Sequence, residues 1–426
     1  MVSNKIVAIS IVAVVIVAAV GAYILLSNDS DDGFNDVTGR LQVFGNVNND
    51  DFIDDDDIRA LDSFINGTEW NQETYPYADA NRDGVLDSSD RDLIQKMIDG
   101  EECTVYYYNG AGEIKTAAYP VNEVGLVGTN VFAVPLVLNV VDRVVARSTT
   151  SSFDQVFHAE LIDLPSIGAK SYELSAEELS KYPQIDTILT YYTSTYDDAV
   201  ETAERAGKNC IQLNTQTGSG TIQSYLLVGF LMGVSERASQ VASFIDDALE
   251  LVESRVATLS ESDKREVLTV CTYHIAGPSY YFTHNTITAG AINPTTFSEN
   301  TISLRENPEY LLSYPNAEML LWYGGCSWED LDEQEIADAY TYRIADFTYG
   351  VGFPESFVVL NSDLPDFMRI LVAGSIIYPD LFPYEEVMDI FQDYVDRFCE
   401  FLGDYDVRTD GTWYITYDMV SDLIDY

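Results

Sequence analysis

The chain has 426 residues, and its 70 Asp and Glu against 22 Lys and Arg give a formal net charge of −48. Hydrophobic residues make up 46% of it, so it can bury enough apolar surface to fold, and the length allows two to four domains. The charge excludes nucleic-acid binding, because a nucleic-acid binder needs a basic surface to displace counterions, and it disfavours anionic lipid surfaces. Cations and metal-bearing ligands would be attracted instead.

An uncharged stretch of 21 residues, Ile6–Leu26, is the first predicted element. As a helix it would be about 31 Å long, which matches a bilayer core of about 30 Å. Lys5 precedes it and acidic residues follow it, which places the N-terminus in the cytoplasm. We expect an uncleaved single-pass anchor in the cell membrane rather than a cleaved signal peptide, with the large C-terminal part extracytoplasmic.

A twelve-residue pattern of oxygen-bearing side chains then occurs twice, from Asn46 to Asp57 and from Asp79 to Asp90. Positions 1, 3, 5, 9 and 12 carry Asp or Asn, and the carbonyl at position 7 completes an EF-hand-type ligand set for Ca²⁺. The predicted ligands are Asn46, Asn48, Asp50, Phe52, Asp54 and Asp57, then Asp79, Asn81, Asp83, Val85, Asp87 and Asp90. Two structural Ca²⁺ ions are predicted, because so short a module has little core of its own.

Each loop leads into one helix with apolar residues at helical spacing, and no matching helix precedes it. This duplication, with Asp at position 12, resembles a type I dockerin over residues 43–100. The resemblance implies a small all-α domain that docks a cohesin-type partner through positions 10 and 11. Those positions carry Asp55 and Asp56 in the first copy and Ser88 and Ser89 in the second. The first copy departs from the pattern there and at position 6, where Asp51 replaces the usual Gly.

The rest of the chain predicts α/β layers, because short apolar strands alternate with helical stretches. A hairpin comes first, with strands at residues 105–108 and 114–121 joined by Asn109-Gly-Ala-Gly. The strands expected after it are Val144–Arg147, Thr187–Tyr191, Cys210–Leu213, Val267–Cys271 and Met319–Tyr323. Helices are expected at Ala199–Ala206 and Gln334–Phe347.

The longest helical stretch runs from Thr221 to Leu259 without proline. One helix of about 39 residues would be about 58 Å long, more than one lobe needs, so we expect a break near Gly229–Ser235. The five cysteines, Cys103, Cys210, Cys271, Cys326 and Cys399, have no metal-type spacing. Since five is odd, at most two disulfides can form, and we expect buried free thiols rather than a disulfide framework.

This order of elements resembles the periplasmic-binding-protein family for iron–siderophore and cobalamin uptake. The long helix and FMRILVAGSIIYPDLFP (Phe367–Pro383) carry the resemblance, which covers roughly residues 119–403. It implies two Rossmann-like lobes joined by a backbone helix, a ligand cleft between them, and delivery to an ABC permease. The expected domains are an anchor (1–27), an acidic linker (28–42), the dockerin-like module (43–102), the first lobe with its leading hairpin (103–228), the inter-lobe helix (229–260) and the second lobe (261–426).

The cleft is expected at the carboxyl ends of the strands, where open α/β sheets bind ligands. The candidate ligand-binding residues are Arg147, Ser148, Ser151, Tyr191, Tyr192, Tyr273, His274, Tyr280, Tyr281, Trp322, Tyr323 and Arg343. Aromatic rings and guanidinium groups suit a flat or catecholate-rich anionic metal chelate. We do not expect a direct metal site in the cleft, because the chain has only three His, with no pair at helical ligand spacing.

The leading interpretation is a membrane-tethered solute-binding protein that captures an iron–siderophore or a corrinoid by lobe closure. The alternative is a cell-surface interaction or scaffold protein, in which the dockerin-like module binds a cohesin-type partner and the large domain has lost transport. An enzyme is not expected, because the sequence contains none of the GxSxG, HExxH and GxxxxGK[ST] motifs and no GxGxxG after a strand.

Overall fold

The computed structural model describes residues 40–150, 154–272, 274–297, 301–304, 308–345 and 356–424. The predicted anchor, Ile6–Leu26, lies outside these residues, as does the acidic linker up to residue 39. Within the described ranges, every helix is too short or too polar to cross a bilayer. The five cysteines all lie in these ranges and are free thiols.

The two helices predicted after the twelve-residue loops are present, as α2 (Asp55–Ile65) and α3 (Ser88–Asp99). Each begins with a capping box. The side chain of the N-cap residue, Asp54 or Asp87, accepts from a main-chain amide of the first turn, and the side chain of the Asp three residues later accepts from the main-chain amide of the N-cap residue. The apolar faces of both helices pack into one small core with residues of the loops. Its buried members are Val47, Ile58, Leu61, Ala78, Ala80 and Ile94.

The predicted hairpin is also present, with β1 (Cys103–Tyr108) antiparallel to β2 (Ile114–Tyr119). Asn109 shapes its turn, because the Asn109 Oδ1 accepts from the amides of Ala111 at 3.0 Å and Glu113 at 2.9 Å. Beyond the hairpin the chain forms two sheets, and all five predicted strands occur in them within one residue of the expected bounds.

The first sheet has five strands in the order β5-β4-β3-β6-β7, and every pair is parallel. The strands are β3 (Val124–Val127), β4 (Val144–Ser148), β5 (Ser166–Gly168), β6 (Thr187–Tyr191) and β7 (Asn209–Leu213). The helices between them are α4 (Ala133–Val137), α5 (Ala176–Leu179) and α6 (Asp197–Arg205). The central strands β3 and β6 are buried throughout, as expected of parallel strands covered on both faces.

The second sheet has six strands in the order β10-β9-β8-β11-β12-β13, with β8, β11 and β12 parallel to one another. The strands are β8 (Val267–Cys271), β9 (His274–Ala276), β10 (Thr301–Ser303), β11 (Met319–Tyr323), β12 (Ser356–Leu360) and β13 (Tyr414–Thr416). The helices are α9 (Tyr281–Thr288), α10 (Glu333–Ala345), α11 (Asp366–Ile377), α12 (Tyr384–Phe398) and α13 (Tyr417–Val420).

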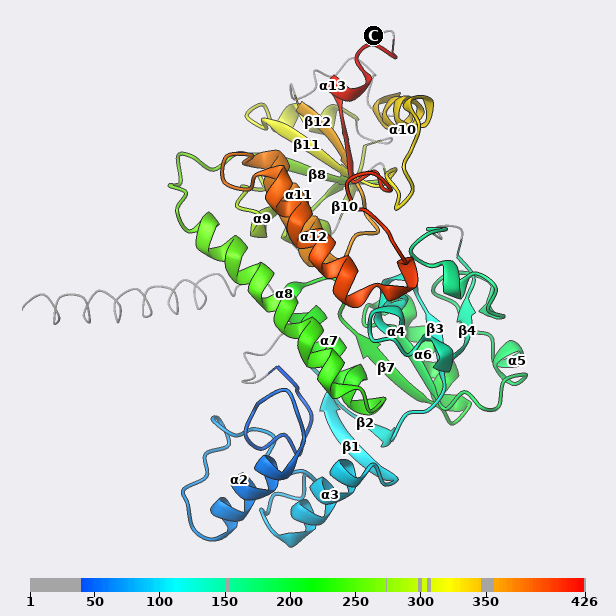
Figure 1. The fold of residues 1–426 in the computed structure, drawn as a ribbon, viewed down its shortest axis with the longest axis vertical. Helices are drawn as coiled ribbons and strands as arrows, with labels where there is room; N and C mark the ends of the chain where they lie inside the picture. The colour runs from blue at the N-terminus through cyan, green and yellow to red at the C-terminus, as the bar shows by residue number, and fades with distance from the viewer. Residues whose placement is uncertain are drawn as a thin grey trace, which may run out of the picture. The chain divides into compact units, whose positions relative to one another are not determined.

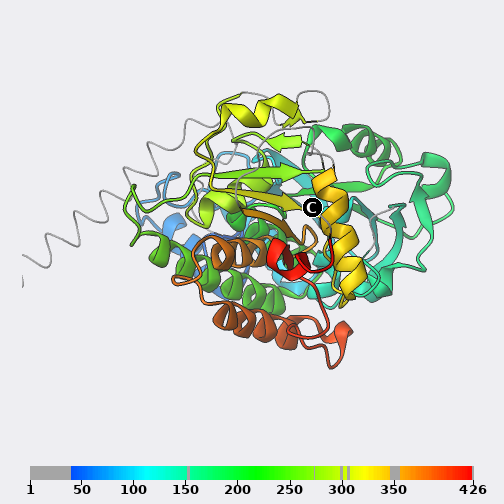
Figure 2. The same ribbon diagram turned by 90° about the horizontal axis from the view of Figure 1, so that it is seen from above.

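The long helical stretch is broken as predicted, into α7 (Gly218–Leu231) and α8 (Ser235–Val256). Figure 1 shows α8 beside α11 and α12, and the same arrangement can be followed from above in Figure 2. A side chain on Gly229 would place its Cβ 2.2 Å from the Cβ of Ala238, so α7 and α8 approach too closely there for any residue larger than glycine. These helices carry the main core, which extends into both sheets.

Candidate functional site

A cavity of about 570 Å³ lies at the carboxyl ends of strands from both sheets. Its lining comes from the segments that directly follow β3, β7, β8, β11 and β12. The residues from these segments are Thr129, Asn130, Thr215, Gln216, Cys271, Thr272, Trp322, Tyr323, Gly324, Gly325, Cys326, Ser362, Asp363, Leu364, Pro365 and Asp366. The cavity is therefore where the rule for open α/β sheets predicted the cleft.

Aromatic rings form much of the wall of this cavity. Phe282 stacks on Tyr323 with ring centroids 4.2 Å apart and planes only 9° from parallel. Arg343 lies over two rings, with its guanidinium carbon 4.9 Å from the Tyr342 centroid and 5.5 Å from the Trp322 centroid. Tyr342 is 61% exposed, so its ring is free to meet a ligand. Such a wall favours a ligand with flat, polarisable surfaces.

Arg369 on α11 joins segments from both sheets beneath the cavity. Its Nε donates to Asn285 Oδ1 at 2.9 Å, and its Nη2 donates to Gln216 Oε1 at 2.6 Å. Its Nη1 donates to the carbonyls of Leu364 at 2.7 Å and Ser362 at 3.1 Å. Since Arg369 is only 2% exposed, these four bonds fix the loops after β7 and β12 relative to α9.

Two carboxyl groups accompany Arg369 in the cavity. Asp366 begins α11 and is 1% exposed, and burial raises its pKa while Arg369 and the Thr221 hydroxyl oppose that rise. Asp363 is exposed within the cavity, yet the protein around it removes enough water to raise its pKa to about 6. Asp154 adds to this rise and Arg369 opposes it. Both groups therefore hold a proton more tightly than an ordinary Asp.

The two halves of the large domain touch beside the cavity. Asp154 Oδ2 accepts from the Ser327 hydroxyl and the Trp328 amide, both at 3.0 Å, and Phe157 stacks on Trp328 at 4.4 Å. His158, next to Phe157, lines the cavity and is buried. Burial lowers its pKa to about 4, so the imidazole is neutral at pH 7.

Four of the candidate ligand residues, Tyr281, Trp322, Tyr323 and Arg343, line the cavity. Ser151 and Tyr273 lie outside the described residues. The other candidates do not contribute to the described lining; they are Arg147, Ser148, Tyr191, Tyr192, His274 and Tyr280.

Arg147 shows why some side chains at strand ends turn away from the cavity. Its guanidinium donates to the carbonyls of Leu161 at 2.7 Å, Ile162 at 2.6 Å and Ser148 at 3.1 Å. Ser148 in turn donates its hydroxyl to the Ser171 carbonyl at 2.8 Å. Both side chains thus bond to main-chain carbonyls, and their contact with a ligand stays a prediction.

The predicted site residues did not include Gln216, Asp366 and Arg369, which the structure brings together in the lining of the cavity. One signal was present: Asp366 and Arg369 are the only charged residues in the apolar stretch DFMRILVAGSII that forms α11. Charged side chains in a helix that is buried along nearly its whole length need partners, and those partners mark a site.

The two predicted calcium loops have matching internal hydrogen bonds. At position 3, the side-chain oxygens of Asn48 and Asn81 accept from the amides of Asp50 at 3.0 Å and Asp83 at 2.8 Å. At position 12, Asp57 Oδ2 accepts from the Asp54 amide at 2.8 Å, and Asp90 accepts equivalently in the second loop. Burial raises the pKa of Asp57 to about 7.

Position 1 of the first loop has a buried side-chain oxygen that no described donor reaches. The side-chain nitrogen of Asn46, Nδ2, donates to the carbonyls of Leu41 and Asp50, at 2.8 and 2.7 Å. Its Oδ1 is buried and accepts no hydrogen bond from the described residues, which suits a hard cation that takes oxygen donors. Over the described ranges, no three His, Cys, Asp or Glu side chains form a metal-holding group; the predicted sets also use Asn and main-chain oxygens, and Ca²⁺ binding stays a prediction.

No protein-family model matches the sequence, and no curated protein matches it. Among solved structures, the chain resembles the TroA-like periplasmic binding protein FepB from Veillonella parvula, with 16% identity and a TM-score of 0.57 over 73% of this chain and 99% of that one. It also resembles Helicobacter pylori CeuE in its Ni-His complex, with 18% identity and a TM-score of 0.52 over 72% and 98%. A third is the Haemophilus influenzae molybdate-binding protein MolA, with 12% identity and a TM-score of 0.51 over 69% and 98%.

These similarities show the fold, which is that of the two-lobed binding proteins of ABC transporters. The prediction of that fold for the large domain is confirmed. The neighbours are described as periplasmic and solute-binding proteins. The dockerin resemblance of residues 43–100 stays a prediction.

Proposed function

We propose that the protein is an extracytoplasmic solute-binding protein that captures a metal chelate in the cavity between its two sheets. The observation that carries this proposal is the position of the cavity, at the carboxyl ends of both sheets in a fold shared with binding proteins. Two structures with that fold, CeuE and MolA, hold a Ni-His complex and molybdate. Lobe closure around the cargo and delivery to an ABC permease follow from this role.

The aromatic wall favours an iron–siderophore or a corrinoid as cargo, because both present large polarisable surfaces. The charges of the described lining differ from the basic cleft expected for an anionic chelate. Two carboxyl groups, Asp363 and Asp366, stand beside the guanidinium groups of Arg343 and Arg369, and Arg147 does not belong to the described lining. Neutral and cationic chelates therefore suit this cavity at least as well as a catecholate complex with several negative charges.

We further propose that Ile6–Leu26 tethers the protein to the cell membrane, and that the two loops bind structural Ca²⁺. The module would dock a cohesin-type partner through its second copy, where Ser88 and Ser89 are exposed. That exposed hydroxyl pair is also the observation in favour of the alternative function, a scaffold protein that uses only this module.

Thermal unfolding of the full chain against ferric siderophores, corrinoids and haem tests the transport function. A ligand at 100 times its dissociation constant adds about 2.7 kcal/mol of stability, which a higher melting temperature reports. Tyr342→Ala should weaken that ligand, because an exposed ring of the cavity is lost, whereas Tyr172→Ala, an exposed ring outside the cavity, should not. If the chain melts cooperatively and no chelate shifts it, the scaffold function replaces the transport function.

A further inference from the structure

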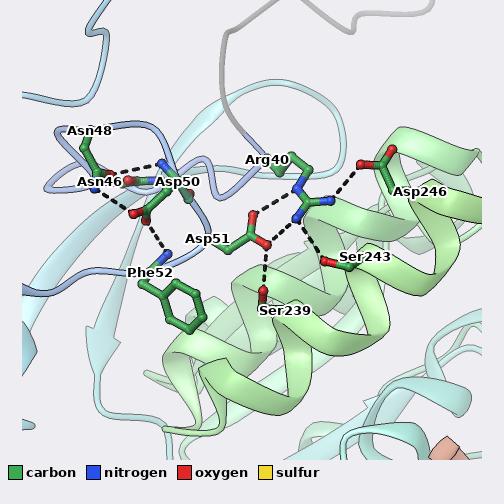
Figure 3. A network of polar contacts seen from close by, with 9 residues as sticks. All are labelled: Arg40, Asn46, Asn48, Asp50, Asp51, Phe52, Ser239, Ser243 and Asp246. Carbon is green, nitrogen blue, oxygen red and sulfur yellow. Dashed lines mark hydrogen bonds and ion pairs between the residues drawn. The ribbon is translucent and has the colours of Figure 1, made fainter.

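Position 6 of the first calcium loop is occupied by Asp51, where the second loop has Gly84. Gly84 is exposed and has a φ of +88°, the left-handed conformation that favours glycine. Asp51 is instead 8% exposed, and its side chain leaves the module. Figure 3 shows its carboxylate directed at α8 of the large domain, beside Arg40.

The contacts of Asp51 form a network across these elements. Arg40 Nε donates to Asp51 Oδ1 at 2.9 Å, and the Ser239 hydroxyl donates to Asp51 Oδ2 at 2.8 Å. The same guanidinium reaches α8 through its Nη1, which donates to Asp246 Oδ2 at 2.8 Å, and through its Nη2, which lies 3.4 Å from Ser243 Oγ. Ser239, Ser243 and Asp246 are four and three residues apart, so they lie on one face of α8.

Asp51 lies between two predicted ligands, Asp50 at position 5 and Phe52 at position 7. Asp50 Oδ1 accepts from the Phe52 amide at 2.8 Å, which closes the loop around Asp51 (Figure 3). The segment that would hold the cation is therefore the segment that holds α8. Ile53 at position 8 adds an apolar contact, because it packs on the core of the module and on the main core.

We propose that the first calcium loop is a brace within the molecule, which holds α8 through Asp51 and Arg40 and stabilises the large domain when Ca²⁺ binds. This inference rests on the Ca²⁺ binding proposed above. The coupling is reciprocal: the free energy by which bound Ca²⁺ strengthens the contact with α8 equals the free energy by which that contact strengthens Ca²⁺ binding to the first loop. The second loop, with Gly84 at position 6, has no such effect.

Calorimetric Ca²⁺ titration of the full chain isolates each loop in turn. Asp83→Ala removes a predicted ligand of the second loop and leaves the first loop intact. Asp50→Ala removes a predicted ligand of the first loop and leaves the second loop intact. Adding Arg40→Gln should weaken Ca²⁺ binding about 5-fold or more in the Asp83→Ala chain, the lower end of typical coupling, and leave it unchanged in the Asp50→Ala chain. Arg59→Gln is the matched control, because Arg59 pairs with Asp56 on the exposed side of α2 and does not touch α8.

Thermal unfolding of the same variants, followed through the large domain, gives a second measurement. Ca²⁺ should raise the melting temperature of the Asp83→Ala chain, and Arg40→Gln should remove a substantial part of that rise. If Ca²⁺ binds to both loops but Arg40→Gln changes neither quantity, the brace is refuted while the calcium sites stand. If the wild-type chain binds no Ca²⁺, both proposals fall.

Discussion

Arg369 lies below the cavity and provides the most demanding test of how the site is built. The variant Arg369→Met keeps most of the side-chain length and removes the guanidinium. Its loss leaves Asn285 Oδ1, Gln216 Oε1 and two main-chain carbonyls without their donor. It also removes the positive charge that opposes the rise in the pKa of the buried Asp366 carboxyl.

The size of the effect follows from these contacts. A hydrogen bond to a charged group contributes about 1.5–3 kcal/mol, but bonds to one side chain do not add fully. Unsatisfied buried acceptors cost about 1–3 kcal/mol each, and Arg369→Met creates four of them beside the buried Asp366 carboxyl. We therefore expect Arg369→Met to lower the free energy of unfolding by about 3–5 kcal/mol, a large part of the roughly 5–15 kcal/mol of a typical domain.

Urea unfolding monitored by tryptophan fluorescence measures this loss. Arg205→Met is the control, because Arg205 forms an exposed helix-surface pair with Glu201 and should cost about 0–1 kcal/mol. In an Asp366→Asn background Arg369→Met should cost less, since the neutral amide no longer needs a counter-charge. A cost below about 1 kcal/mol for Arg369→Met, or no relief from Asp366→Asn, would show that Arg369 does not hold the floor of the cavity.

Two further predictions concern burial and close packing. The folded-state pKa of His158, about 4, lies below the ordinary value of about 6.5, so the unfolded chain takes up the proton first as pH falls. Relative to His158→Gln, the wild type should lose about 3 kcal/mol of stability between pH 6.5 and pH 4 in urea unfolding, and a constant difference would contradict the burial argument. Gly229→Ala should lower the free energy of unfolding by about 1–3 kcal/mol, because the added methyl group forces α7 away from α8. The double variant Gly229→Ala/Ala238→Gly should recover part of that loss. If the double variant is less stable than Gly229→Ala alone, the close approach of the two helices is not the cause.

The regular elements could be predicted because their patterns are local. A parallel strand with both faces covered is a short apolar run, and Met319–Tyr323 and Thr187–Tyr191 were found at their predicted bounds. The position of the cavity followed from topology, since ligands of open sheets bind where strands end. These two rules predict α/β layers with a cleft at the strand ends, whereas the two-lobed arrangement came from the family resemblance.

Side-chain direction at the end of a strand is not local, so the sequence alone does not give it. Arg147 lies one residue before the end of β4, and its side chain turns to carbonyls 14 and 15 residues further on, whose positions depend on how that loop folds. Asp51 similarly looked like a defect in the calcium pattern, because its partner Ser239 is 188 residues away in the chain. Arg369 was used only as part of the stretch Phe367–Pro383 that carries the family resemblance, although a charge in an apolar stretch calls for partners.

One helix connects the cavity with the calcium-loop module. Thr221 and Tyr225 of α7 line the cavity, and the residue midway between them, Gln223, lies on another face of the helix. There its amide donates to Gln42 Oε1 at 2.8 Å and to the Tyr108 carbonyl at 2.9 Å. The chain that enters the first calcium loop and the chain of the hairpin are therefore fixed to the helix that forms one wall of the cavity. Because α7 packs on α8 with no room for a side chain at Gly229, a brace on α8 also restrains that wall.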